Sequence, residues 1–366
     1  MSNFDMAYGY GDDAREALSS CLRNLQRDHH AALGVVYATD ALAEEFGSIV
    51  ESLREHTCVP HWTGAVGMGI CAGGREFYDS PALAVMLLDI EPAGFKLFHS
   101  ADELFDLCES SRSLQVALCH ADPRWHQLAD FIYRIPERLE NTFMLGGLAS
   151  TRGAHTDSED VESSVEGVLF GENVSIVTAL TQGCSLIGAQ HEITECDENV
   201  ILSLDNHNAL EIFKQDIGEP FATDLRKTQG QIFAAVPVPG DDRGAYQVRN
   251  IMELDESQGA VAIGEYVQRG DPLMFCRRDA QSAMKDLQRM LQGLKKRIHS
   301  RVKGGIYITC IGRGRSLFGE NSRECQWVQE AFDVPIIGFY ANGELSGQRL
   351  FAYSGVLCLF LHDEVH

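Results

Sequence analysis

The residues best suited to chemistry lie in a short segment near the C-terminal end of the chain. Cys310 ends an apolar run, and Ile311-Gly312-Arg313-Gly314-Arg315 follows it. Glycines leave backbone N–H groups accessible, and a helix start beyond the turn favours anions. Two arginines can grip a carboxylate or phosphate in bidentate fashion. The segment predicts an anion-recognition corner, and its alternative is a tight turn with both arginines in solvent or paired with acids.

The helix expected after this turn has Asn321 as its N-cap and Glu324 at the capping-box position. No Gly-Lys-Ser/Thr sequence follows the glycines, so the segment is not a Walker A loop.

Cys310 has a second interpretation. Beside Arg313, Arg315 and a helix start, its thiolate would be stabilised, which favours a reactive or redox-sensing thiol. A cysteine at the end of a strand is more often buried packing. As a nucleophile it also needs a nearby base, and no G-x-S-x-G or fixed Cys/His pattern identifies one. A Cys-dependent hydrolase or transferase is therefore the alternative from another functional class.

A second turn, Gly338 to Glu344, has the same kind of composition. Asn342 tolerates left-handed backbone and Gly343 is often required there. Asn342 and Glu344 either present polar groups to a ligand or only close the turn. The candidate ligand-binding residues of the whole chain are Cys310, Gly312, Arg313, Gly314, Arg315, Tyr340, Asn342, Gly343, Glu344, Gly146 and Gly147.

These turns belong to a unit that occurs three times. Apolar runs at 33–38, 116–119 and 306–311 each precede a helical pattern, a further apolar run and a glycine turn. The repetition predicts an α/β (mixed α+β) fold, with repeated strand-helix-strand units forming mixed sheets covered by helices. The apolar runs at 82–90, 165–180 and 350–361 are expected to be hairpin partners.

The chain divides into a helical N-terminal extension at 1–29 and two pseudo-duplicated domains at 30–207 and 208–366. Thr151 to Ser164 is polar and acidic and is expected to form an exposed loop. A helix is predicted over 282–302, with a basic end that includes Lys295 and Lys296. We interpret this basic run as a solvated face that compensates the helix dipole, in preference to a docking patch.

Composition excludes several functional classes. The chain has 366 residues and a formal net charge of −23, which argues against binding to nucleic acid or to anionic membrane surfaces. No apolar stretch reaches the roughly 18 residues of a membrane span, and no signal peptide is visible. Eleven cysteines without C-x-x-C spacing indicate reduced thiols in an acidic cytoplasmic protein.

Several motifs together resemble the FIST family. They are Gly183-Cys184 through Gly188, Thr194, Asn208 to Glu211, Asn141 to Ser150, Cys310 to Gly314, and Gly338 to Glu344. The resemblance implies a FIST N-terminal domain followed by a FIST C-terminal domain, from about residue 30 to the end. It also implies a sensory protein of signal transduction that binds a small ligand and signals to a partner such as a histidine kinase. The family supplies no settled set of catalytic residues.

Some family members are haem proteins that sense nitric oxide, so the resemblance makes haem the candidate cofactor. Haem iron needs an axial ligand, and His61 and His191 have the best positions among the thirteen histidines. No cluster of histidines and carboxylates has metal-ligand spacing. We therefore expect a ligand-sensing module without catalysis; an enzyme that uses Cys310 and a pure scaffold are the alternatives.

Overall fold

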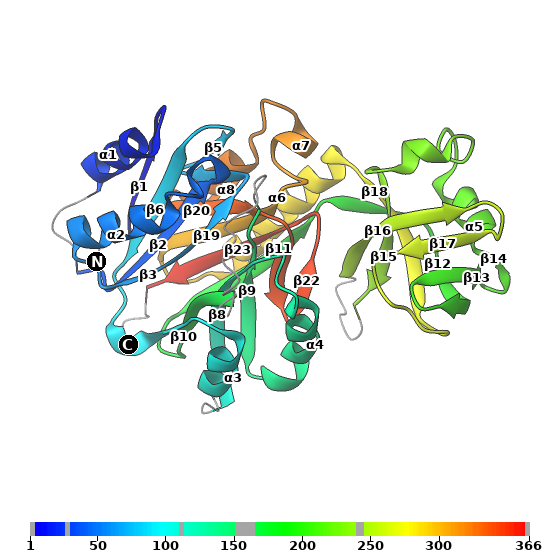
Figure 1. Cartoon of the computed structure of the whole chain (residues 1–366), viewed down its shortest axis with the longest axis horizontal. Coiled ribbons are helices and arrows are strands. Elements are labelled where there is room, and N and C mark those ends of the chain that lie inside the picture. The colour runs from blue at the N-terminus through cyan, green and yellow to red at the C-terminus, as the bar shows by residue number, and fades with distance from the viewer. Residues whose placement is uncertain (1–3, 26–29, 110–112, 151–164, 239–244, 363–366) are drawn as a thin grey trace. The chain divides into compact units, whose positions relative to one another are not determined.

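A computed structural model describes residues 4–25, 30–109, 113–150, 165–238 and 245–362 (Figure 1). The chain forms two compact units. The larger unit comprises Met1–Thr181 and Leu287–His366, and the barrel unit, Gln182–Asp286, is inserted between these two parts. These two compact units do not coincide with the domains at 30–207 and 208–366 expected from the sequence. The expected domains are family domains, and their boundary at 208 stays a prediction.

Three parallel strand pairs form the framework of the larger unit: β2 with β3, β8 with β9, and β19 with β20. Each pair is connected through a helix, so the threefold repeat and the mixed α/β class are confirmed. The strands are β2 (Leu33–Thr39), β3 (His61–Gly67), β8 (Gln115–Ala121), β9 (Thr142–Leu148), β19 (Val302–Cys310) and β20 (Ile336–Ala341). The connecting helices are α2 (Phe46–Thr57), α4 (Leu128–Arg138) and α8 (Glu324–Phe332).

Strands that follow the glycine turns pair with another repeat instead of their own. β4 (Gly69–Ala72), from the first repeat, pairs antiparallel with β20 of the third repeat. β21 (Glu344–Gly347), from the third repeat, pairs antiparallel with β9 of the second. Each of these strands continues into a hairpin, with β5 (Arg75–Tyr78) and β22 (Arg349–Phe351) respectively. The repeats are therefore interlocked, and β21 crosses from one sheet to the next at the glycine turns.

Of the three runs expected as hairpin partners, the one at 350–361 contributes to the β21–β22 hairpin, whereas the other two have different neighbours. β6 (Ala82–Leu88) lies between β1 (Asp5–Tyr10) and β2, because a strand with all seven residues buried needs a neighbour on each edge. β10 (Val165–Phe170) and β11 (Ile176–Gln182) belong to different sheets. The run at 165–180 therefore forms two strands, but they do not pair with each other as a hairpin.

The complete sheets of the larger unit are ordered β1-β6-β2-β3, β22-β21-β9-β8-β10-β7 and β11-β23-β19-β20-β4-β5. The remaining elements of this unit are β7 (Phe95–Phe98), β23 (Ser354–Leu361), α1 (Ala14–Asn24), α3 (Ala101–Glu109) and α7 (Arg315–Phe318). Residues 1–29 thus contribute a strand as well as the expected helix, which begins where the Asp13 side chain accepts the backbone N–H of Glu16 at 2.8 Å. The predicted loop at 151–164 lies outside the described residues.

The long helix α6 (Ala280–Arg297) confirms the apolar spacing seen in the sequence. Leu287, Leu291 and Leu294 are buried against β19, β20 and β23. The helix ends at Arg297, five residues before the predicted end, because the chain turns there and Val302 begins β19. Its last turn carries three cations, as the helix dipole favours.

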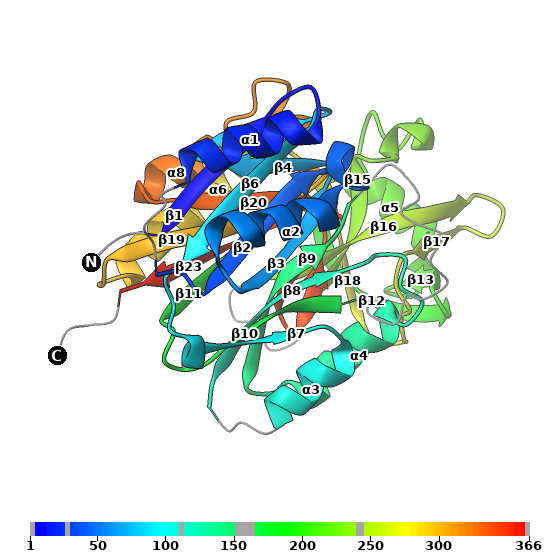
Figure 2. The same ribbon diagram turned by 60° about the vertical axis from the view of Figure 1, so that its left-hand side comes forward.

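The barrel unit is antiparallel throughout its sheet. The strand order β12-β18-β15-β16-β17-β13 closes on itself because β12 also pairs with β13 (Figure 2). Helix α5 (Ala209–Ile217) packs Leu210 and Phe213 into the barrel core, and Asn208 caps it by accepting the Glu211 N–H at 3.1 Å. The strands are β12 (Cys184–Asp197), β13 (Val200–Leu204), β14 (His207–Asn208), β15 (Ile232–Pro237), β16 (Tyr246–Asp255), β17 (Ala260–Ile263) and β18 (Pro272–Arg278).

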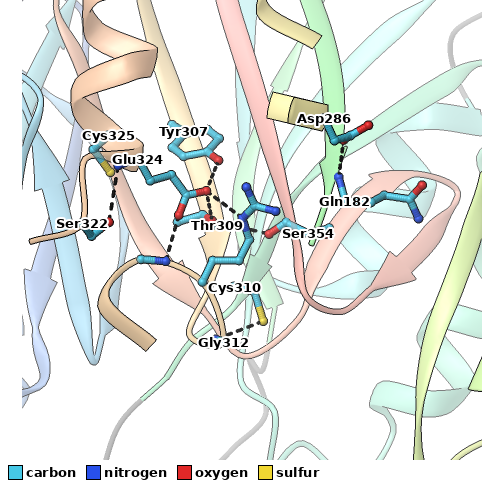
Figure 3. Close-up of polar contacts among 12 residues, drawn as sticks. Gln182, Asp286, Tyr307, Thr309, Cys310, Gly312, Ser322, Glu324, Cys325 and Ser354 are labelled. Carbon is cyan, nitrogen blue, oxygen red and sulfur yellow. Dashed lines mark hydrogen bonds and ion pairs between the residues drawn. The ribbon is translucent and has the colours of Figure 1, made fainter. Parts of the chain in front are cut away.

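The two ends of the barrel unit are joined to each other. The backbone N–H of Gln182 donates to Oδ2 of Asp286 at 2.7 Å (Figure 3). The chain therefore enters and leaves this unit at neighbouring points.

Candidate functional site

Glu324 is the centre of a buried polar network in the larger unit. Helix α8 begins at Glu324 with Arg323 as its N-cap, so the prediction of Asn321 as N-cap is wrong. The Glu324 carboxylate is fully buried and turns into the protein instead of forming a capping box (Figure 3). It accepts hydrogen bonds from Tyr307 Oη (2.7 Å), Thr309 Oγ1 (3.3 Å), Arg313 Nε (2.7 Å) and the Gly314 backbone N–H (2.8 Å).

The local sequence explains this convergence. Tyr307 and Thr309 are two positions apart on β19, so both side chains leave the same face of the strand. The chain then turns, with the Arg313 N–H donating to the Cys310 carbonyl at 2.8 Å. Gly314 has φ +50°, and a Cβ there would lie 2.5 Å from the Tyr340 ring. A glycine is therefore required for the turn that aims its N–H at Glu324.

Arg313 is 1% exposed and only part of its guanidinium is used. Burial alone lowers the pKa of an arginine, but the Glu324 carboxylate outweighs it and holds the pKa of Arg313 above the usual value. Its Nη1 and Nη2 atoms have no hydrogen-bond partner among the described residues. Buried donors without a partner are rare and costly, so these two atoms are the candidate contacts for a bound group.

Glu344 on β21 is a second buried carboxyl in the same region. Its Oε2 accepts the backbone N–H of Ser354 at 3.1 Å and the Ser354 hydroxyl at 2.7 Å. Its Oε1 has no partner within the part of the chain that the structure describes. Burial raises the pKa of Glu344 to about 8, and the opposing effects of Ser354 and the Arg313 charge do not cancel it. The carboxyl is therefore largely protonated at neutral pH.

The predicted glycines position Glu344. Across the β21–β9 ladder, Glu344 lies opposite Gly147 and Leu345 opposite Gly146. A Cβ on Gly147 would lie 3.1 Å from the Gly343 carbonyl oxygen, so glycine permits the close approach of this turn. The turn is fixed to Leu148 by the backbone N–H of Asn342 and by the carbonyl of Gly343, each at 2.9 Å. The side chain of Asn342 is exposed.

Arg315 and Tyr340 make a separate set of contacts. The Arg315 guanidinium pairs with Asp79 and lies 4.4 Å from the centre of the Tyr78 ring. The Tyr340 ring packs beside the same Tyr78 at 5.0 Å, and its hydroxyl is 3.5 Å from the Cys325 sulfur. The two arginines of the predicted corner therefore have different partners, and both are paired with acids.

Cys310 is buried within the site. Its sulfur accepts the Gly312 backbone N–H at 3.4 Å. Burial, followed by the nearby Glu344, raises the pKa of the Cys310 thiol well above its usual range. The surroundings therefore favour the protonated thiol, which is the unreactive form.

The two candidate haem ligands differ in their surroundings. His191, in the barrel unit, has Nδ1 at 2.7 Å from Asp205 Oδ2 and Nε2 at 2.9 Å from Asp216 Oδ2. Both ring nitrogens are thus occupied, and this arrangement does not fit iron coordination. His61 begins β3 in the larger unit, and its ring lies 5.6 Å from that of Phe95. Its nitrogens have no hydrogen-bond partner among the described residues, so it keeps the capacity to ligate.

A third histidine, His120, lies where the repeats meet. It contacts Tyr37 Oη at 3.1 Å and Thr63 Oγ1 at 3.2 Å, and burial lowers its pKa to about 3. It is neutral and structural. Within the described ranges, no group of three or more His, Cys, Asp or Glu side chains could hold a metal ion, and no helix is long and apolar enough to cross a membrane.

Sequence reasoning missed the roles of Tyr307, Thr309, Glu324 and Ser354. Tyr307 and Thr309 stand out in retrospect, because they are polar residues at alternate positions in an otherwise apolar buried strand. No comparable signal identified Glu324, whose position fits a capping box equally well.

The chain belongs to the FIST family, a family of sensory signal-transduction domains. The FIST N domain matches residues 32–207 and the FIST C domain matches residues 209–346. An uncharacterized protein of Mycobacterium tuberculosis is 28% identical over 307 residues, covering 77% of this chain and 78% of its own length. An uncharacterized protein of Mycobacterium bovis is 26% identical over 358 residues, covering 91% of each chain.

Proposed function

We propose that this protein is a cytoplasmic sensor that binds a small anion at Arg313 and Glu344 and signals to a separate partner such as a histidine kinase. One observation carries the proposal. The fully buried Arg313 has two Nη donors without a hydrogen-bond partner among the described residues. Arg313 lies close enough to Glu344 for its charge to lower the pKa of that carboxyl. Oε1 of Glu344 also has no partner among the described residues. Membership of a sensory family supports this use of the site.

The chemistry of the two groups defines the class of ligand. The parallel N–H groups of a guanidinium match the two oxygens of a carboxylate or the edge of an oxoanion. The protonated Glu344 adds a hydrogen-bond donor instead of a repelling charge. The ion pair with Glu324 fixes the orientation of the guanidinium before a ligand arrives, which lowers the entropic cost of binding.

Tyr353 covers the turn that holds Arg313. A Cβ on Gly312 would lie 2.8 Å from the Tyr353 ring, so the ring packs directly on this glycine. Tyr353 is only half-buried and has φ +57°, which is strained for a bulky residue. A ligand reaches Arg313 by displacing this strained turn between β22 and β23.

A haem-based nitric oxide sensor is the alternative within the family, with His61 as its axial ligand. Among the described residues, the support for a haem sensor is limited to His61, whose ring nitrogens have no hydrogen-bond partner there. Purified protein with histidine-ligated haem would absorb strongly near about 400 nm, and a spectrum without such a band after haem titration removes this branch.

An enzyme that depends on Cys310 is the alternative of another class. The raised pKa and the burial of this thiol oppose it. We therefore propose binding without catalysis.

A thermal-shift screen with small monocarboxylates, dicarboxylates and oxoanions tests the proposal. Arg313→Lys keeps a cation beside Glu324 but removes the Nη fork, and Arg315→Lys is the matched control at the half-buried arginine. We expect at least one anion to raise the Tm of wild type and Arg315→Lys but not of Arg313→Lys. A screen in which Arg313→Lys responds like wild type contradicts the proposal.

A further inference from the structure

Strand β16 of the barrel unit extends beyond the start of its neighbour β15. The ladder between the two strands ends where Phe233 lies opposite Asn250, and β15 begins at the preceding residue, Ile232. β16 continues to Asp255 with β17 on its other edge. Among the described residues, the edge of β16 on the side of β15 is therefore open from Met252 onward.

The open edge leaves backbone N–H and C=O groups without a strand to pair with. A strand directs these groups to both of its edges. Within the described ranges, residues 252–254 make no backbone hydrogen bond outside the β16–β17 ladder. Strand edges of this kind are templates for pairing with a further strand, and proteins usually cover them or place charges on them.

A groove of about 610 Å³ follows this edge. All residues of β16 from Asn250 to Leu254 line it. Successive side chains of a strand point to opposite faces, so a groove lined by consecutive residues borders the edge of the strand and not one face. The opposite wall is the 3-10 helix η3 (Leu225–Thr228) with the turn that follows it to Gly230.

The groove has apolar side chains beside the backbone edge. Leu225, Ile251, Met252 and Leu254 line it. The Met252 side chain is 64% exposed, which is unusual for a large apolar residue in a strand. Methionine is unbranched and adapts its shape to different partners. The groove therefore offers backbone hydrogen bonds along one side and adaptable apolar contacts around them.

We propose that the open edge of β16 binds an extended segment of a partner protein, which joins the sheet as a further strand and places apolar side chains in the groove. The unpaired backbone groups identify the occupant as an extended chain, because a helix satisfies its own backbone groups internally. The edge strand of a second copy fits less well, since the wall formed by η3 stands before both edges. The proposal does not rest on the anion site.

Fluorescence anisotropy with synthetic peptides tests the pairing. The probes are fluorescein-labelled peptides of about eight residues, in which Val, Ile or Leu alternates with Thr. We expect at least one of them to bind saturably. Two further forms of that peptide carry N-methyl groups on the amides of one edge or of the other. One form should bind at least about tenfold more weakly, because it loses the donors that face β16, and the other should bind like the parent.

Three variants of the protein locate the binding site. Met252→Lys replaces the exposed apolar side chain by a charge, and Gln229→Trp fills the groove from the opposite wall. Tyr266→Lys is the control, because Tyr266 is 79% exposed in the same unit and does not line the groove. With folding checked by circular dichroism, both groove variants should weaken binding at least about tenfold, and Tyr266→Lys should leave it unchanged.

Hydrogen exchange measured by mass spectrometry gives an independent location. Peptide binding should slow the exchange of amides within 251–255. The proposal is overturned if no peptide of the panel binds saturably, if both N-methylated forms bind like the parent, or if protection appears only elsewhere in the chain. Self-association of wild type that Met252→Lys abolishes would make a second copy the occupant and would also overturn it. None of these results bears on the anion screen with Arg313→Lys, so the two proposals fail separately.

Discussion

Arg313 and Glu324, eleven positions apart in the sequence, form an ion pair in which both side chains are inaccessible to solvent. Nε of the arginine donates to Oε1 of the glutamate at 2.7 Å, while Nη1 and Nη2 have no partner among the described residues. The pair joins a glycine turn to the start of α8. One half of the guanidinium is committed to the fold, and the other half is the part that we propose binds a ligand.

Removing the buried carboxylate should strongly destabilise the protein. Glu324→Gln leaves the Arg313 charge buried without a counter-charge, which typically costs about 3–5 kcal/mol. Urea unfolding measures this loss. The exposed pair Glu51–Arg54 is the control, because Glu51→Gln should change the free energy of unfolding by less than about 1 kcal/mol. Equal effects of the two substitutions would show that the buried pair is not a structural centre.

Glu344→Gln should change how stability depends on pH. The pKa of Glu344 rises from 4.5 to about 8 on burial, so the folded chain holds the proton more tightly than the unfolded chain. The contribution of the protonated carboxyl to the free energy of unfolding is complete below about pH 4.5 and is lost as the pH rises through about 8. Between these values wild type should lose stability relative to the variant, by at most about 1.4 kcal/mol per pH unit. Parallel pH profiles of the two proteins would contradict the burial of a protonated carboxyl.

Cys310 should be unreactive in the folded protein. Burial and the nearby Glu344 raise the pKa of its thiol, whereas Cys58 is exposed at the end of α2. Brief treatment with iodoacetamide at pH 7.5, followed by peptide mass spectrometry, should find Cys58 alkylated and Cys310 unmodified. Labelling of Cys310 at a rate similar to that of Cys58 would restore the hypothesis of a cysteine-dependent enzyme.

His191 should titrate above the usual range for histidine. Burial lowers its pKa, but the hydrogen bonds to Asp205 and Asp216 outweigh this effect and raise it. Because the folded-state pKa is raised, the stabilisation is complete below the unfolded value of 6.5 and is lost as the pH rises through the folded value. NMR titration of the ring protons, assigned with His191→Gln, measures the pKa. A value below 6.5 would show that the two carboxylates do not bind the ring in solution.

The repeated pattern in the sequence predicted the three parallel strand pairs, because each run of buried apolar residues and each connecting helix has its own local signal. It did not predict that β4 and β21 join the sheets of other repeats. That exchange depends on pairing between segments far apart in the chain, such as Gly338 with Cys71 and Glu344 with Gly147. The closed barrel was missed for the same reason. Its β12–β13 pair is a local hairpin, but the pairing of β12 with β18 and of β13 with β17 joins segments far apart in the chain.

Glycine and arginine spacing placed Cys310, Gly312, Arg313 and Gly314 in one candidate site, and the exchanged strand β21 adds Glu344 to it. Sequence alone could not separate Arg313 from Arg315. Arg313 points into a buried network and Arg315 reaches Asp79 near the surface, and this difference depends on where Glu324 lies in the folded chain.

The most direct test of the account is isothermal titration calorimetry with the anion that gives the largest shift in the thermal screen. We predict one site per chain in wild type and in Arg315→Lys. Affinity should be at least about tenfold lower in Arg313→Lys, because two charge-assisted hydrogen bonds are removed while the ion pair with Glu324 is kept. Equal affinity of wild type and Arg313→Lys would contradict the account, because the free half of the buried guanidinium would then bind nothing.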